Sequence, residues 1–97
     1  MKKITEHPPE TLVELMDIIL SRVCSGLKSS RNLLANACTE MEGFRIDPDA
    51  PEPEKIEILI NYVETLRDEN GNVIFSSVEI EEYRAFLKKL TEQEQMK

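Results

Sequence analysis

Apolar side chains in the first part of the chain recur at an interval of seven, with further apolar positions three residues later. This spacing is typical of a helix with a continuous apolar seam. Prolines and an acidic residue at positions 8–10 suit a helix start, and Gly43 suits a helix end. We therefore expect helix over residues 8–42. The seam residues expected to form an interface are Val13, Met16, Leu20, Val23, Leu27 and Leu34.

Gly26 and the serines around it weaken this helical pattern, because glycine and serine are poorer helix formers than alanine or leucine. An unbroken helix over residues 8–42 would be about 50 Å long. A compact domain of this chain length has a diameter of only about 32 Å. The helix therefore either breaks near Gly26 or projects from the domain and pairs with another chain, and the sequence leaves both outcomes open.

Residues 55–67 fit two patterns. Isoleucines at alternate positions 56, 58 and 60 match a strand, whereas apolar residues at 56, 59, 60 and 63 match a helix. The β-branched residues favour the strand, and the turn signal at 68–71 precedes a second β-type run. We therefore predict a β-hairpin over residues 55–76, with a helix ending at Asn70-Gly71 as the alternative.

The last segment has a clearer pattern. Ser76 and Glu79 form a capping box, and apolar residues then recur at helical spacing, which predicts a helix over residues 77–93. The predicted fold is a single α+β domain over residues 1–97. It consists of the N-terminal helix, with or without a kink, a connector over 43–54, the hairpin and the C-terminal helix. An all-α small helical bundle is the alternative.

The charge of the chain is concentrated in and beside the connector. The chain has a net charge of −7, and residues 40–57 hold seven acidic and two basic side chains. Direct binding to nucleic acid or to anionic membranes is disfavoured, because both need clustered Lys and Arg. An acidic surface instead suits a basic protein partner. The acidic residues expected to face such a partner are Glu40, Glu42, Asp47, Asp49, Glu52 and Glu54.

Residues that could support catalysis are sparse. His7 is the single histidine, and nothing places a nucleophile beside it. Cys24 and Cys38 fit no zinc spacing, and on one continuous helix they would lie about 21 Å apart, too far for a disulfide. We expect both to be reduced, half-buried thiols, and we expect a protein that is not an enzyme and has no cofactor.

One segment comes close to the spacing of an EF-hand calcium loop. Oxygen-bearing side chains occupy loop positions 1, 3, 5, 9 and 12, and a predicted helix follows. However, the glycine required at position 6 is Val73 here, so a hairpin turn is the preferred interpretation. The residues of this weak calcium candidate are Asp68, Asn70, Asn72, Ser76 and Glu79.

Together these features predict a cytoplasmic, non-enzymatic protein that binds another macromolecule as an accessory adaptor or inhibitor. We expect it to self-associate through the apolar seam, and we expect no membrane span, because no apolar run is long enough. Two other functions remain. The chain could be an acidic inhibitor that occupies the nucleic-acid-binding site of another protein, or a protein that binds calcium or a small ligand.

Overall fold

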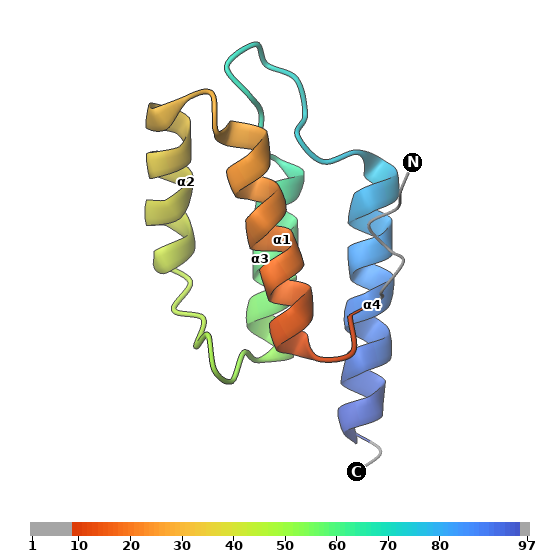
Figure 1. Ribbon diagram of the computed structural model, residues 1–97. Helices are drawn as coiled ribbons and strands as arrows, with labels where there is room; N and C mark the ends of the chain where they lie inside the picture. The colour runs from red at the N-terminus through yellow and green to blue at the C-terminus, as the bar shows by residue number, and fades with distance from the viewer. Residues whose placement is uncertain (1–8, 96–97) are drawn as a thin grey trace.

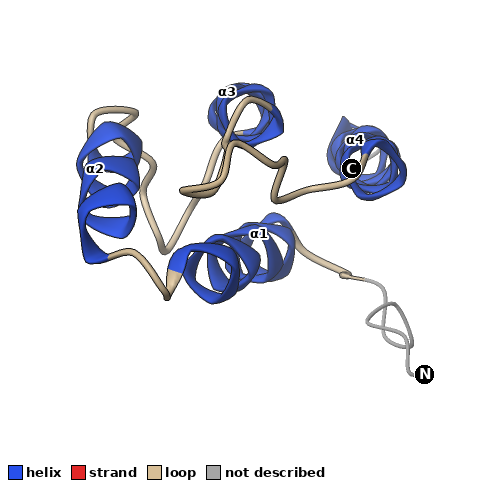
Figure 2. Ribbon diagram, turned by 90° about the horizontal axis from the view of Figure 1, so that it is seen from above, coloured by secondary structure: helices blue, strands red, loops and turns tan. Residues whose placement is uncertain are grey.

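The computed structural model describes residues 9–95, and this part of the chain folds into four helices (Figure 1). Helix α1 packs against each of the other three, and α3 packs against α4. Viewed from above, α2, α3 and α4 form a row, and α1 lies along one side of it (Figure 2). The molecule is flat, with extents of 44 × 34 × 18 Å. The helices are α1 (Leu12–Leu27), α2 (Arg31–Glu42), α3 (Pro53–Glu64) and α4 (Ser77–Gln95).

The β-hairpin predicted over residues 55–76 is wrong, and so is the α+β class. The structure is an all-helical bundle in which residues 53–64 form α3. Ile56 and Ile60 are fully buried, whereas Ile58, which a strand would place on the same face, is 44% exposed. The helical period therefore decides which side chains reach the core, and this burial outweighs β-propensity. Of the hairpin, only the turn and an isolated bridge between Arg67 and Val73 remain.

The segment over residues 8–42 forms two helices, with the break just after Gly26. Helix α1 ends at Leu27, and the Ser30 side chain caps α2 by accepting a hydrogen bond from the Leu33 amide at 3.4 Å. Gly26 itself lies inside α1, where a Cβ atom would clash with Cγ2 of Ile74. The glycine therefore permits close packing of α1 on the α3–α4 loop, and the serine cap begins the second helix.

Helix α4 begins as predicted. The Ser76 hydroxyl accepts a hydrogen bond from the Glu79 amide at 3.2 Å, and the Glu79 carboxylate accepts one from the Ser76 amide at 3.1 Å. This reciprocal pair is the capping box expected from the sequence. None of the helices in the described part of the chain is both long enough and apolar enough to span a bilayer.

The core lies between α1 and the row of the other helices. Helix α1 supplies six buried apolar side chains, α3 supplies four, and α2 supplies only Ala37. Phe75 and Tyr83 extend this core with an edge-to-face contact at 5.8 Å between ring centroids. Helix α1 is thus the central element, and α2 is the least embedded. The buried residues of α1 are Leu12, Leu15, Met16, Ile19, Val23 and Leu27.

Candidate functional site

Six acidic residues lie in the segment where α2 ends and α3 begins. Figure 1 shows that α1 starts at the same end of the molecule. All six acidic residues named from the sequence are solvent-exposed. Two lie in the last turn of α2, two in the loop, one at the N-cap of α3 and one in its first turn. We call this group the acidic end. It consists of Glu40, Glu42, Asp47, Asp49, Glu52 and Glu54.

The loop that carries these acids is held by its own hydrogen bonds. The Lys55 ammonium donates to the carbonyls of Phe44 and Arg45, at 2.9 and 3.2 Å. The Asp47 carboxylate accepts from the Asp49 amide at 2.9 Å, which closes a tight turn. The Phe44 ring also packs edge-to-face on Tyr62 of α3, at 5.5 Å between centroids. These contacts fix the direction in which the loop presents its carboxylates.

The helix ends here contribute partial charges of both signs, because the negative C-terminus of α2 lies beside the positive N-termini of α1 and α3. Glu40 and Glu42 lie in the last turn of α2, where the helix dipole is negative and where no basic residue compensates. Burial raises the pKa of the nearby Tyr62 above its ordinary value, and Glu40 and Cys38 raise it further. Lys55, one of two bases in the segment, is half-buried and turned toward backbone carbonyls. The arrangement therefore disfavours acidic partners and suits a basic one.

The structure divides the predicted apolar seam between the core and the surface. Met16, Val23 and Leu27 are buried, with exposures of 4%, 0% and 1%. The other three, Val13, Leu20 and Leu34, are only half-buried. Three of the six expected interface residues thus belong to the interior of this chain, and three remain within reach of a partner.

The two cysteines lie on different helices, Cys24 on α1 and Cys38 on α2. Both are free and exposed, so the expectation of half-buried thiols is wrong. Each cysteine follows a buried residue, Val23 or Ala37, and lies about 100° further round its helix, outside the apolar stripe that faces the core. His7 lies outside the described residues.

The calcium-like spacing falls on a loop between two helices, α3 and α4, but its groups already have partners. The Asp68 carboxylate accepts from the amides of Asn70 and Asn72, at 2.8 and 3.0 Å. The Glu79 carboxylate is paired with Arg22 at 2.9 Å. Residues 9–95 contain no group of three or more His, Cys, Asp or Glu that could hold a metal ion. A calcium ion here would therefore have to displace the Arg22 guanidinium.

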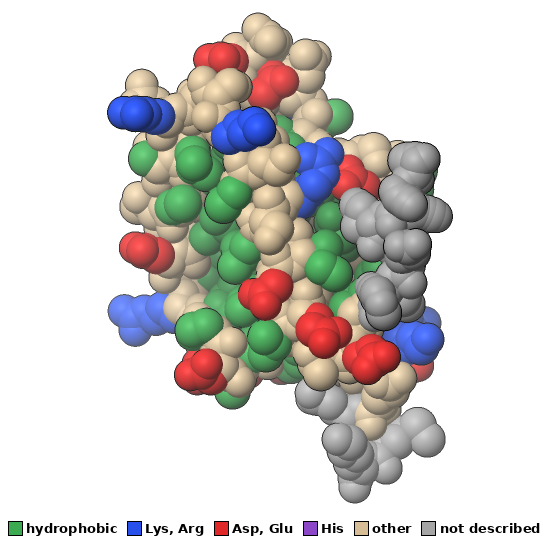
Figure 3. Space-filling model, viewed as in Figure 1, with side chains coloured by type: hydrophobic (Ala, Val, Ile, Leu, Met, Phe, Trp, Pro, Cys, Tyr) green, Lys and Arg blue, Asp and Glu red, His purple; other side chains and the backbone are tan. Residues whose placement is uncertain are grey.

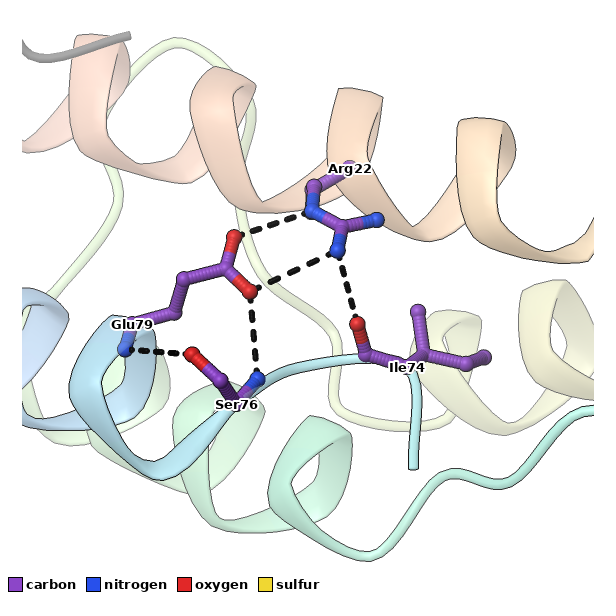
Figure 4. A network of polar contacts seen from close by, with 4 residues as sticks. All are labelled: Arg22, Ile74, Ser76 and Glu79. Atoms are coloured by element: carbon purple, nitrogen blue, oxygen red, sulfur yellow. Dashed lines mark hydrogen bonds and ion pairs between the residues drawn. The ribbon is translucent and has the colours of Figure 1, made fainter. Parts of the chain in front are cut away.

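Arg22 is the central residue of a polar network that sequence reasoning missed (Figure 4). Its guanidinium donates to both Glu79 carboxylate oxygens, at 2.9 and 3.4 Å, and to the Ile74 carbonyl at 2.7 Å. It also lies over the Phe75 ring, 5.3 Å from its centroid. In calcium-loop numbering, Ile74 supplies the position-7 carbonyl and Glu79 the position-12 carboxylate. The Arg22 guanidinium thus joins α1 to the α3–α4 loop and to the start of α4.

The described surface hollows do not bring together catalytic groups. One hollow has a volume of about 640 Å³ and opens between α3 and α4, where Glu57, Arg84 and Leu87 are among its lining residues. A smaller hollow between α1 and α4 is bordered by Ile18, Arg22 and Tyr83. No nucleophile with a base within hydrogen-bonding distance lies in either hollow.

No known protein family, no curated protein and no solved structure matches this chain.

Proposed function

We propose that this chain is a non-enzymatic cytoplasmic protein, an adaptor or inhibitor, that binds a basic surface of another protein through its acidic end. The observation that carries the proposal is the loop between α2 and α3, which is held by hydrogen bonds such as that from Lys55 to Phe44. This loop presents exposed carboxylates to solvent and has few basic residues among them. The two exposed free thiols suit a reducing compartment such as the cytoplasm.

Charge and rigidity together support a binding role for this end. Residues 40–57 carry a net charge of −5 out of −7 for the whole chain. Such a field attracts basic partners and accelerates their association. Because Lys55 and Asp47 already order the loop, little conformational entropy remains to be lost on binding. The surface is therefore prepared for a partner whose own Lys and Arg side chains are clustered.

A natural class of partner is a protein whose basic patch otherwise binds phosphate groups. Nucleic-acid-binding sites are patches of clustered Lys and Arg. A protein that covers such a patch with carboxylates acts as an inhibitor of nucleic-acid binding. This form of the proposal predicts competition between the acidic end and nucleic acid.

The test compares two variants with the same net charge. In the first, Asp47, Asp49, Glu52 and Glu54 are replaced by Asn or Gln. In the control, the exposed acids Glu69, Glu81, Glu82 and Glu92 are replaced by Gln. Each tagged protein is used to capture partners from nuclease-treated native lysate at several salt concentrations, with quantitative mass spectrometry of what is retained.

We expect a basic protein that the wild type and the control retain at low salt, and that the acidic-end variant loses. Its retention should fall steeply with salt, because exposed charges are screened. Added nucleic acid should release it if the inhibitor form is right. A partner that the acidic-end variant still holds, or no basic partner at any salt concentration, would contradict the proposal.

A further inference from the structure

Helices α1 and α2 share an outward face away from the loop that carries most of the acidic end. On α1, the flank with Ile18 and Arg22 faces α4, because Arg22 pairs with Glu79 and both residues border the hollow with Tyr83. The opposite flank of α1, which includes Leu20 and Cys24, therefore faces α2 and the solvent beside it. Asp17 lies between the two flanks on the outer side of α1, because it also borders the hollow with Tyr83. In Figure 3, apolar side chains run along this face over both helices.

Both helices carry the same pattern of residues on this face, with the charges reversed. On α1, an acid is followed by Leu, Cys and a base, and on α2 a base is followed by Leu, Cys and an acid. The spacing is 3, 4 and 4 residues in both cases, which keeps each set on one stripe of its helix. The leucines are half-buried and the other members are exposed. The stripes are Asp17, Leu20, Cys24 and Lys28 on α1, and Arg31, Leu34, Cys38 and Glu42 on α2.

Figure 1 shows that α1 and α2 run in opposite directions. Because the order of charges is reversed between the two stripes, charges of the same sign therefore lie at the same end of the face. Lys28 and Arg31 lie together at the connection between the helices, and Asp17 and Glu42 lie at the far end of the face. The Leu and Cys residues lie between these two charged rows. Figure 3 shows basic side chains toward the connection, and toward the other end it shows several acidic side chains together with a basic one at the lower left. Neither ion pair among the described residues uses any of these four charges.

This arrangement is complementary to a second copy of itself turned end for end. In each stripe the acid and the base are 11 residues apart, which is about 16 Å along the helix. A two-fold axis that crosses both helices at the middle of the face therefore places Asp17 over the partner copy's Lys28 and Glu42 over its Arg31. A two-fold axis parallel to the helices would instead place Asp17 over the partner copy's Glu42, and these like charges would repel each other.

We propose that two copies of this chain associate face to face and antiparallel through α1 and α2. The face is about 20 Å wide and about 24 Å long, a footprint of about 500 Å² on each copy. This is at the low end for a specific dimer. The dimer is therefore weak, with self-association in the micromolar range or above. The proposal goes beyond the function proposed above, because it concerns a different face and a different partner, and it leaves Asp47, Asp49, Glu52 and Glu54 free.

Sedimentation velocity over a concentration series tests this dimer in purified protein. The wild type should dimerise reversibly, less so at high salt. Asp17→Lys and Lys28→Glu should each weaken dimerisation about tenfold, because each breaks two symmetry-related pairs and creates repulsion. The double variant D17K/K28E should recover most of the wild-type affinity. Glu81→Lys and Lys88→Glu on the exposed side of α4 are matched controls that should leave it unchanged.

A short bismaleimide gives a second measurement, on the direction of pairing. In the antiparallel arrangement, the Cys24 residues of the two copies come within about 5 Å of each other along the helix axis, and so do the Cys38 residues. Cys38→Ser and Cys24→Ser variants should therefore each still cross-link to a dimer. A monomer at every concentration, a double variant no better than the single ones, or cross-linking that requires both cysteines would overturn the proposal.

Discussion

Gly26 and Ile74 lie so close that the glycine has no room for a side chain, although Gly26 sits inside a helix. In an exposed helix, Gly→Ala stabilises the fold by about 1 kcal/mol. At Gly26 we expect the opposite sign. The new methyl group would push Ile74 away from α1, and overpacking of this kind costs about 1–3 kcal/mol.

Thermal or urea unfolding of Gly26→Ala measures this sign directly. Ile74→Leu removes the methyl branch that Gly26 faces and keeps the side-chain volume. The double variant G26A/I74L should therefore be more stable than G26A alone. If G26A alone is more stable than the wild type, the close contact between α1 and the loop does not constrain position 26.

Tyr83 makes the stability depend on pH in the alkaline range. Its pKa is raised to about 12, first by burial and then by the charges of Glu79 and Glu82, with Arg22 acting in the opposite direction. Below pH 10 the phenol is neutral in both the folded and the unfolded state, so its contribution is fully present. Between pH 10 and 12 the unfolded state ionises first, so this contribution is lost as the pH rises.

The loss should amount to about 2–3 kcal/mol by pH 12. The free energies of unfolding of the wild type and Tyr83→Phe are measured from pH 9 to 12. The wild-type value minus the Tyr83→Phe value should fall by that amount over this range. Lysine titration affects both proteins equally and cancels in the difference. Two curves that stay parallel over this range would show that Tyr83 ionises at its ordinary pKa.

At the scale of elements, two Arg–Glu pairs differ in what they join. Arg22 and Glu79 have side chains that are 32% and 23% exposed, and Arg22 also holds the Ile74 carbonyl. Arg84 and Glu64 are 42% and 49% exposed, and link the surfaces of α3 and α4. Hydrogen bonds to charged, partly buried groups are worth about 1.5–3 kcal/mol, and exposed pairs under about 1 kcal/mol.

We therefore expect Arg22→Gln to lower the free energy of unfolding by about 2 kcal/mol and Arg84→Gln by well under 1 kcal/mol. Urea titrations of the two variants, with the same substitution type in each, give the comparison. Equal losses would mean that the network around Arg22 contributes no more than a surface ion pair.

The elements also show what sequence could and could not decide. Helix α4 was predictable because its signals, the Ser76–Glu79 box and the apolar stripe after it, are local. Helix α3 was not, because positions 56–63 satisfy both periods and the choice depends on whether a neighbour covers Ile58. That neighbour would have to come from elsewhere in the fold, and propensity alone carries no information about it.

For the whole molecule, the acidic end was predictable because prolines and charges keep a segment at the surface. The Arg22 network was not, since its partners lie 52 and 57 residues away. The repeated stripe of α1 and α2 is present in the sequence, but its meaning needs the break at residues 28–30. Only once the two helices run antiparallel do the reversed charges form matching rows.

The central position of α1 also has a consequence for the order of events during synthesis. Helix α1 is synthesised before the other three helices, yet Ile74 and Glu79, which bind Arg22 of α1, emerge more than 50 residues later than Arg22. Helix α2 arrives early but offers α1 only one fully buried side chain, Ala37. Part of the apolar face of α1 therefore stays exposed while most of the chain is translated. A nascent chain that stalls before α4 is synthesised is the form most accessible to chaperones and proteases.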